Sequence, residues 1–309
     1  TPNGDFPTCP YPNPEIRQAL EVGLKVAKDV GADILIATDP DCDRVGIAVK
    51  QGDDFRLFSG NEVGVLLTDF IAKRKIAMGI MPKKPVLVKT IVTTDLAKRV
   101  ADDYGIETRD VLTGFKYIGD QIAGLEKDGE VDRYLLGFEE SYGYLSGSYV
   151  RDKDAVNGSY LIAQMFAYYK AEGKSLLEVL EGLYKKYGYY LNTLYSFEFD
   201  GESGMNKMND IMDSFRNNTP NEIAGVKVLE VRDYETSTQT TLKTGAKEEI
   251  KLPKSNVIKY MLEGNSSAVL RPSGTEPKLK LYLAITGENE SSARELESKI
   301  ADELKKHLA

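Results

Sequence analysis

Between residues 61 and 138, short apolar runs alternate with longer stretches of helical periodicity. The apolar runs are VLVKTIV, IETRDVL and RYLLGF, and the stretches between them are long enough for helices of about 10–15 residues. Strands that alternate with helices form βαβ units, which build a parallel sheet. The sequence therefore predicts an α/β domain, in which ligands bind at the loops that follow the strands.

The segments on either side of this region have different patterns. Apolar residues at helical spacing over 14–30 are followed by short predicted strands that end at residue 58. Predicted helices over 154–171 and 175–187 close the alternating region, and the strands and helices beyond them follow no regular order. A chain of 309 residues suggests about two domains and allows three smaller ones. We therefore expect α/β units followed by a smaller α+β domain.

Composition argues against several classes of protein. The formal net charge of −8 argues against a nucleic-acid partner, because nucleic-acid affinity comes largely from a basic face. No apolar run approaches the roughly 18 residues of a membrane helix, and the N-terminus lacks the pattern of a signal peptide. Cys9 and Cys42 are too few for a disulfide framework. We expect a cytoplasmic protein with no membrane partner. Its start at Thr1, in a turn-like stretch, suggests a piece of a longer polypeptide.

The sharpest motif is TDPDCDR at residues 38–44, directly after an apolar strand. In extended backbone alternate side chains share a face, so Asp39, Asp41 and Asp43 can converge. Clustered carboxylates repel one another unless a hard cation binds them, and oxygen-only ligands suit Mg²⁺. The loop therefore predicts a Mg²⁺ site. It does not fit an EF-hand, because Arg44 stands at the sixth position, which needs glycine.

A second motif, GFEESYGYLSG at 137–147, follows the predicted strand RYLLGF. Glu139 and Ser141 stand two residues apart, so they can face one side and offer an acceptor and a hydroxyl group to a polyol. Arg151 and Lys153 follow in the sequence and can bring positive charge beside this loop. A surface loop with ordinary charges is the competing interpretation.

A third motif, RPSGTEPK at 271–278, has the composition of a phosphate clamp. An arginine can form a bidentate fork with phosphate, hydroxyl groups can donate to it, and glycine permits a nest of backbone N–H groups. The residues that would form the clamp are Arg271, Ser273, Gly274 and Thr275. The alternative is an ordinary hairpin turn.

Two smaller signals concern isolated cationic residues. Lys116 lies in TGFKY, where the chain turns from strand to helix, and a solvated surface charge is the more common role of such a lysine. His307 is the only histidine and lies among lysines in the last predicted helix. With no second histidine, a metal site built from histidines is excluded within this chain.

Taken in order along the chain, TDPDCDR, TGFKY, GFEESYG with RDKDAV, and RPSGTEPK resemble the motifs of the α-D-phosphohexomutase superfamily, which includes phosphoglucomutases and phosphomannomutases. Phe138, where many members have Gly, resembles a bacterial branch that also contains phosphopentomutase-like members. The resemblance implies an α/β fold of two phosphohexomutase-type units with mixed sheets, the first one partial, and a smaller α+β C-terminal domain. Residues 1–60 would end domain 2, residues 61–188 would form domain 3, and residues 189–309 would form the C-terminal phosphate-binding domain.

The same resemblance implies roles for individual residues. The three aspartates of the acidic loop would bind Mg²⁺, and Arg44 would lie beside the reacting phosphoryl group. Glu139 and Ser141 match the positions that hold sugar hydroxyls, and the RPSGTEPK turn matches the clamp for the substrate's non-transferring phosphate. Lys116 and Lys153 match basic residues of the cleft, one of which would serve in proton transfer.

The resemblance further implies an isomerase that interconverts hexose 1-phosphate and hexose 6-phosphate, with glucose or mannose phosphates as substrates. The transfer would pass through a phosphoserine and a bisphosphate. Relatives carry this serine in a T-x-S-H-N-P-like loop of domain 1, and no S-H-N occurs here. We therefore expect a missing N-terminal domain of the same polypeptide to supply it, and this chain alone to be inactive. The alternatives are a phosphopentomutase, a non-catalytic phosphosugar-binding module and a phosphatase with Asp39 as nucleophile.

Overall fold

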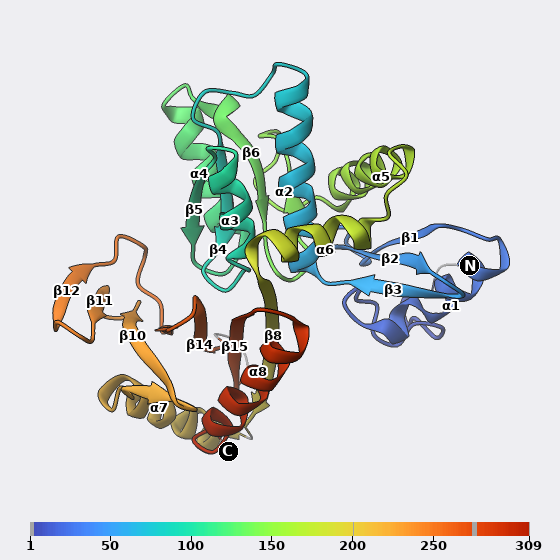
Figure 1. Cartoon of the computed structure of the whole chain (residues 1–309). Helices are drawn as coiled ribbons and strands as arrows, with labels where there is room; N and C mark the ends of the chain where they lie inside the picture. Colours follow the sequence, from blue (N-terminus) through green and yellow to red (C-terminus); the bar gives the residue numbers. More distant parts are fainter. Residues whose placement is uncertain (1–2, 200, 274–276, 309) are drawn as a thin grey trace. The chain divides into compact units, whose positions relative to one another are not determined.

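The chain folds into two compact units, Thr1–Leu183 and Tyr184–Ala309. The computed structural model describes residues 3–199, 201–273 and 277–308, and Figure 1 shows its helices and strands. The first unit contains a three-stranded and a four-stranded sheet with their helices, and the second contains one large sheet with two helices. The expected mixture of α/β units followed by an α+β domain is therefore confirmed.

The three-stranded sheet presents the acidic motif as the turn of a β-hairpin. Strands β1 (Ile34–Thr38), β2 (Val45–Gln51) and β3 (Asp54–Phe58) run antiparallel in the order β1-β2-β3. Helix α1 (Arg17–Asp29) buries its regularly spaced apolar residues against this sheet, as its periodicity predicts. Because the register pairs the last residue of β1 with the first of β2, residues 39–44 form the connecting loop.

The four-stranded sheet has the parallel arrangement that the alternating pattern predicts. Strand β4 (Val86–Thr90) lies between β5 (Glu107–Val111) and β6 (Tyr134–Phe138) and pairs parallel with both. The short strand β7 (Tyr144–Leu145) pairs antiparallel with β6 at the edge. Every residue of β4 and β6 is buried, as is usual for parallel strands that are covered on both faces.

Helices connect these strands in the first unit. Helix α4 packs its apolar side chains against β4 and β5, and a capping box formed by Ser59 and Glu62 begins α2. Helix α6 crosses the boundary between the two units. The helices are α2 (Gly60–Ala77), α3 (Leu96–Asp103), α4 (Phe115–Lys127), α5 (Ala155–Ala171) and α6 (Leu176–Tyr187), with a single 3₁₀ turn, η1 (Val131–Arg133).

The second unit is built on an antiparallel sheet of eight strands in the order β12-β11-β10-β13-β14-β15-β8, with β9 paired to β10. Its core lies between this sheet and helices α7 and α8. Two strands, β11 and β12, have polar sequences without apolar alternation, so they carry no sequence signal of a strand. The elements are β8 (Tyr189–Glu198), α7 (Gly201–Asn217), β9 (Glu222–Ile223), β10 (Val226–Asp233), β11 (Thr238–Thr241), β12 (Ala246–Glu249), β13 (Ile258–Leu262), β14 (Ser266–Pro272), β15 (Lys278–Gly287) and α8 (Glu290–Lys305).

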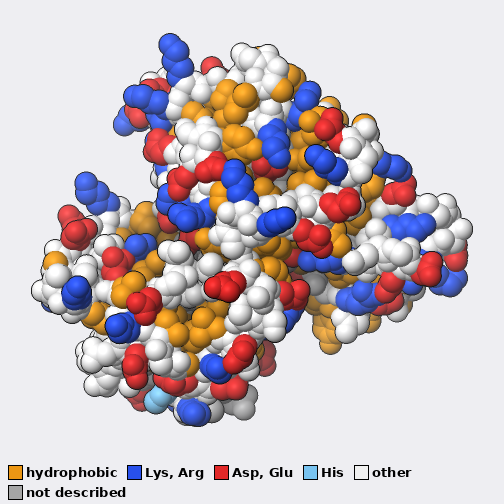
Figure 2. All heavy atoms as spheres, viewed as in Figure 1, with side chains coloured by type: hydrophobic (Ala, Val, Ile, Leu, Met, Phe, Trp, Pro, Cys, Tyr) orange, Lys and Arg blue, Asp and Glu red, His pale blue; other side chains and the backbone are white. Residues whose placement is uncertain are grey.

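The surface of each unit mixes charges of both signs. On the face drawn in Figure 2, acidic and basic side chains are interspersed with neutral and apolar ones. Within residues 3–199, 201–273 and 277–308, no helix combines the length and apolar character needed to cross a lipid bilayer.

Candidate functional site

The acidic loop folds tightly around Asp39. One oxygen of this side chain, Oδ1, accepts the backbone N–H groups of Asp43 at 3.1 Å and Arg44 at 3.0 Å. Cys42 takes a left-handed conformation with φ of 58°, which lets the loop turn. As a result, Asp39, Asp41 and Asp43 each present a carboxylate oxygen, and these oxygens lie within 4.8 Å of one another.

The electrostatics of this loop fit a hard divalent cation. Burial raises the pKa of Asp39, and the neighbouring charges of Asp43 and Asp41 raise it further, against the backbone hydrogen bonds that lower it. The Oδ1 atom of Asp43 is buried and has no hydrogen-bond partner among the described residues. A buried carboxylate oxygen without a donor, beside two more carboxylates, is the environment that an oxygen-coordinated ion such as Mg²⁺ would satisfy.

Two cationic side chains lie against the acidic loop. Arg44 Nε lies 3.8 Å from Asp39 Oδ2 and 3.8 Å from Asp43 Oδ1, and its Nη1 lies 3.6 Å from Glu15 Oε1. Lys153 Nζ lies 2.7 Å from Asp43 Oδ2, and the lysine side chain is only 14% exposed. The loop therefore has positive charge beside it in addition to the carboxylates.

Backbone hydrogen bonds join the acidic loop to the GFEESYG loop, although the two are about 100 residues apart in the sequence. Val45 N–H donates to Tyr142 O at 3.0 Å, and Arg44 forms a β-bridge with Gly143. Ala155 N–H, at the start of α5, donates to Cys42 O at 3.0 Å. These bonds hold the acidic loop, the GFEESYG loop and the start of α5 side by side.

Glu139 lies at the end of β6, in a buried position. It is 7% exposed, and its Oε1 accepts the backbone N–H of Gly114 at 3.0 Å. Burial raises the pKa of Glu139 to about 7, with a further contribution from the charge of Glu140, while Lys153 lowers it. Near neutral pH the carboxyl group can therefore accept or donate a proton. Ser141 is half-buried in the same loop.

The other predicted basic residues have different surroundings. The guanidinium of Arg151 pairs with Glu126 on α4 and donates to the carbonyl oxygens of Ser148 and Val150. Lys116 is exposed at the start of α4, where its ammonium lies 4.9 Å from the centre of the Tyr117 ring. Neither side chain has a described contact with the acidic loop.

The predicted phosphate turn belongs to the second unit. Arg271 lies at the end of β14, where its Nη1 donates to Tyr282 Oη at 3.4 Å, and Ser273 N–H donates to Lys278 O at 2.7 Å. The two remaining residues of the predicted clamp, Gly274 and Thr275, lie outside the described residues.

Sequence reasoning missed a buried polar group that supports the GFEESYG loop. Thr90, the last residue of β4, and Thr93, just after it, each donate a hydroxyl hydrogen bond of 3.1 Å to Glu140 Oε2. Lys89 is completely buried between Asp95 and Asp110, at 2.8 and 2.9 Å. A lysine inside the apolar run VLVKTIV was a signal of such a group, because a buried ammonium needs partners.

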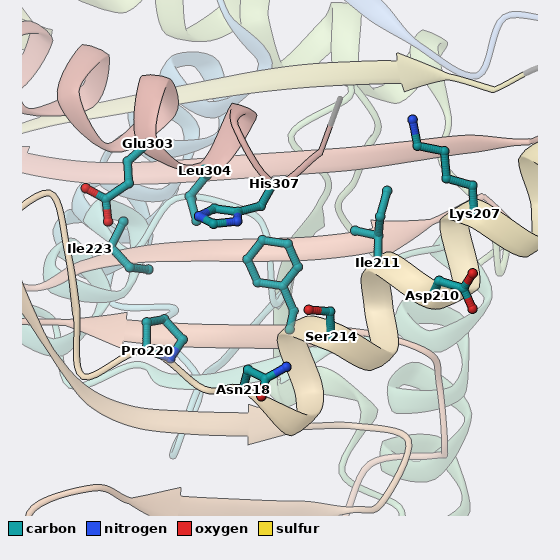
Figure 3. A pocket seen from close by; sticks show the side chains of 11 residues that line it. Lys207, Asp210, Ile211, Ser214, Asn218, Pro220, Ile223, Glu303, Leu304 and His307 are labelled. Atoms are coloured by element: carbon teal, nitrogen blue, oxygen red, sulfur yellow. The ribbon is translucent and has the colours of Figure 1, made fainter.

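A separate cavity of about 430 Å³ lies in the second unit, between α7 and α8 (Figure 3). Its apolar wall includes Phe215, Ile223 and Leu304, and its polar residues include Lys207 and Glu303. His307 also lines it, with its ring edge-on to that of Phe215 at 6.1 Å.

Comparison with known proteins identifies the family. The model for domain II of the phosphoglucomutase/phosphomannomutase family, described as an alpha/beta/alpha domain, matches residues 1–52, and the model for domain III matches residues 59–187. The phosphoglucomutase of Staphylococcus saprophyticus is 40% identical over 289 residues, which are 93% of this chain and 51% of that protein. The chain belongs to the phosphoglucomutase/phosphomannomutase family. It spans about half the length of the curated relatives that it matches.

Solved structures of phosphoglucomutase/phosphomannomutase type have the same fold. A putative phosphomannomutase from Thermus thermophilus superposes with a TM-score of 0.62 at 20% identity, over 96% of this chain and 51% of that one. An N-acetylphosphoglucosamine mutase of Aspergillus fumigatus, solved with GlcNAc-6P and magnesium, has a TM-score of 0.50 at 14% identity, over 92% of this chain and 52% of that one. These structures share the fold, and the two family models and the phosphoglucomutase relatives confirm the resemblance inferred from the sequence motifs.

Proposed function

We propose that this chain supplies the metal-binding and sugar-binding parts of a Mg²⁺-dependent phosphosugar mutase, an isomerase that interconverts hexose 1-phosphate and hexose 6-phosphate. The observation that carries the proposal is the convergence of three aspartate carboxylates beside the loop that contains Glu139, in a chain of this family. Relatives named phosphoglucomutase support glucose phosphates as the substrate.

Each part of the site would have a distinct task. Asp39, Asp41 and Asp43 would hold Mg²⁺, which neutralises charge on a phosphoryl group when bound. A magnesium-bound structural neighbour supports this choice of metal. Arg44 and Lys153 would add positive charge next to the transferring group.

The sugar and the second phosphate would be held elsewhere. Glu139 and Ser141 would bind sugar hydroxyls, with the buried Glu139 accepting or donating a proton near neutral pH. In the second unit, Arg271 and Ser273 would bind a phosphate group through charge-assisted hydrogen bonds. We propose domain boundaries near residues 60 and 188, which the ranges of the two family models support.

The 309 residues contain no S-H-N sequence, so we propose that the phosphoserine is supplied by another segment and that this chain alone binds but does not isomerise phosphosugars. Calorimetry should detect Mg²⁺ binding and weak glucose 1-phosphate binding. Asp41→Asn, which removes one carboxylate charge, should weaken Mg²⁺ binding, while Asp29→Asn at the exposed end of α1 should leave it unchanged. Glucose 1-phosphate turnover by the purified chain would refute the claim of inactivity, and absence of Mg²⁺ binding would refute the site.

A phosphatase predicts different results. If Asp39 were a nucleophile, the unchanged chain would hydrolyse p-nitrophenyl phosphate. The Asp39→Asn variant would then lose this activity, and the Asp43→Ala variant would keep it. We expect neither variant nor the unchanged chain to hydrolyse this ester, because one oxygen of Asp39 accepts the two backbone N–H groups of the turn and we assign the carboxylate to the metal site.

A further inference from the structure

Lys153 makes a direct contact with one of the predicted metal ligands. Its Nζ lies 2.7 Å from Asp43 Oδ2 and 3.4 Å from Asp152 Oδ1, and its side chain is 14% exposed while that of Asp43 is 26% exposed. We call Asp39, Asp41 and Asp43 the acidic trio. Among the described ion pairs of this trio, the pair of Lys153 with Asp43 is the one at hydrogen-bond distance, whereas Arg44 Nε lies 3.8 Å from the carboxylate oxygens. Lys153 therefore acts as the close counter-ion of Asp43.

The backbone fixes the position of this lysine. Asp154 N–H donates to Tyr144 O at 3.0 Å, and Ala155 N–H donates to Cys42 O at 3.0 Å, so the residues beside Lys153 are tied to both loops. The aliphatic stem packs on Gly143, where an added Cβ would lie 2.6 Å from Lys153 Cδ. The stem is thus held by packing, and the ammonium group is the part that can change partners.

We propose that Lys153 and a divalent cation compete for Asp43, so that metal binding displaces the ammonium from the acidic loop and makes it available on the Glu139 side. The inference rests on the proposed function, because it takes the trio as the metal site. A cation on the trio requires direct carboxylate ligands, and two cations on one half-buried carboxylate repel each other strongly. The displaced ammonium has an acceptor on the same turn, because Glu139 N–H donates to Gly143 O at 2.9 Å and the Lys153 stem packs on Gly143.

The competition can be measured as metal affinity by calorimetry with Mg²⁺ and with Mn²⁺. Lys153→Met keeps the unbranched stem and removes the ammonium, so it should tighten metal binding at least about tenfold, as expected when a charge-assisted hydrogen bond no longer has to be broken. Lys153→Arg keeps the charge and should bind metal no more than a few-fold differently from the unchanged chain. Lys98→Met removes an exposed lysine that pairs with Asp102, and it should have no effect.

Arg44→Met tests whether the change in metal affinity requires a direct hydrogen bond to the acidic loop or only a nearby positive charge. It removes the same unit of charge from a guanidinium that is near the trio but not hydrogen-bonded to it, so its effect on metal affinity should be clearly smaller than that of Lys153→Met. A crystal structure with Mn²⁺ should place Lys153 Nζ more than about 4 Å from Asp43 Oδ2, beyond the range of an ion pair.

The outcomes distinguish this inference from the function on which it rests. Equal tightening by Lys153→Met and Arg44→Met, no tightening by Lys153→Met, or an intact ion pair in the Mn²⁺-bound structure would each overturn the competition while leaving the metal site in place. If neither the unchanged chain nor Lys153→Met bound Mg²⁺ or Mn²⁺, with folding confirmed by circular dichroism, the metal site itself would be refuted, and the competition with it.

Discussion

Glu139 should make the stability of the first unit depend on pH. Burial, followed by the charge of Glu140, raises the pKa of Glu139 from an ordinary value of 4.5 to about 7. The difference of 7 − 4.5, about 2.5 pH units, corresponds to about 3.5 kcal/mol in total at about 1.4 kcal/mol per unit, of which about 3 kcal/mol falls between pH 4.5 and pH 8. Because the folded pKa is the higher one, the folded state binds the proton more tightly. The free energy of unfolding should therefore fall as pH rises from about 4.5 to about 7.

The test compares the unchanged chain with Glu139→Gln. Glutamine keeps a side-chain oxygen that can accept the Gly114 N–H, but it has no charge to bury. Urea unfolding of both proteins is monitored by circular dichroism with a chelator present. Between pH 4.5 and pH 8, the free energy of unfolding of Glu139→Gln should rise by about 3 kcal/mol relative to that of the unchanged chain.

Two further variants control this measurement. Glu181→Gln on α6 replaces an exposed glutamate and should follow the unchanged chain at every pH. Glu140→Gln removes the neighbouring charge, so it should shift the fall in stability to lower pH. At each pH, the free energy of unfolding of the second unit should be the same in all variants. A stability difference between Glu139→Gln and the unchanged chain that stays constant from pH 4.5 to pH 8 would refute the assigned pKa.

Three other substitutions test packing, a buried charge and the phosphate turn. Gly60→Ala should lower the free energy of unfolding by at least about 2 kcal/mol, because the added Cβ would lie 2.1 Å from a carbonyl oxygen of the GFEESYG loop. Gly124→Ala is the control, because its Cβ would meet open space and should be neutral or slightly stabilising. Equal urea midpoints for the two variants would contradict this prediction. Lys89→Met should lower the free energy of unfolding by about 2 kcal/mol. This loss is smaller than for a fully buried ion pair, because the two aspartates that contact Lys89 are about one-third exposed. An unchanged urea unfolding curve would contradict this prediction. Arg271→Ala should weaken glucose 1-phosphate binding by about 1.5–3 kcal/mol, and an unchanged calorimetric affinity would count against the clamp.

Local sequence patterns predicted most elements of the fold, because apolar spacing records which face of a helix or strand is buried. The runs that became β4 and β6 are continuous and apolar, and both strands are buried throughout. Strands β11 and β12 have the sequences TQTT and AKEE, which lack any apolar alternation. Their pairing is set by the neighbouring strand β10, so the sequence pattern could not indicate it.

The candidate site could be predicted in its motifs but not in its contacts. The predicted convergence of the aspartates is present, but it arises from a turn with Cys42 in a left-handed conformation and not from the alternation of an extended backbone. The bond from Ala155 N–H to Cys42 O joins residues more than 100 positions apart, and no local pattern encodes it. The same holds for Arg151, whose nearness to the GFEESYG loop in sequence did not reveal its partner on α4.

The pairing of β8 with β15 determines where this protein can be divided. β8 is the first strand of the second unit, and it is hydrogen-bonded to β15 over its whole length, from Tyr189 opposite Gly287 to Glu198 opposite Lys278. A fragment that starts after residue 198 would leave the flank of β15 exposed, and uncovered strand edges of this kind favour aggregation. A usable expression fragment of the second unit should therefore begin ahead of Tyr189, at the cost of carrying the end of α6 with it.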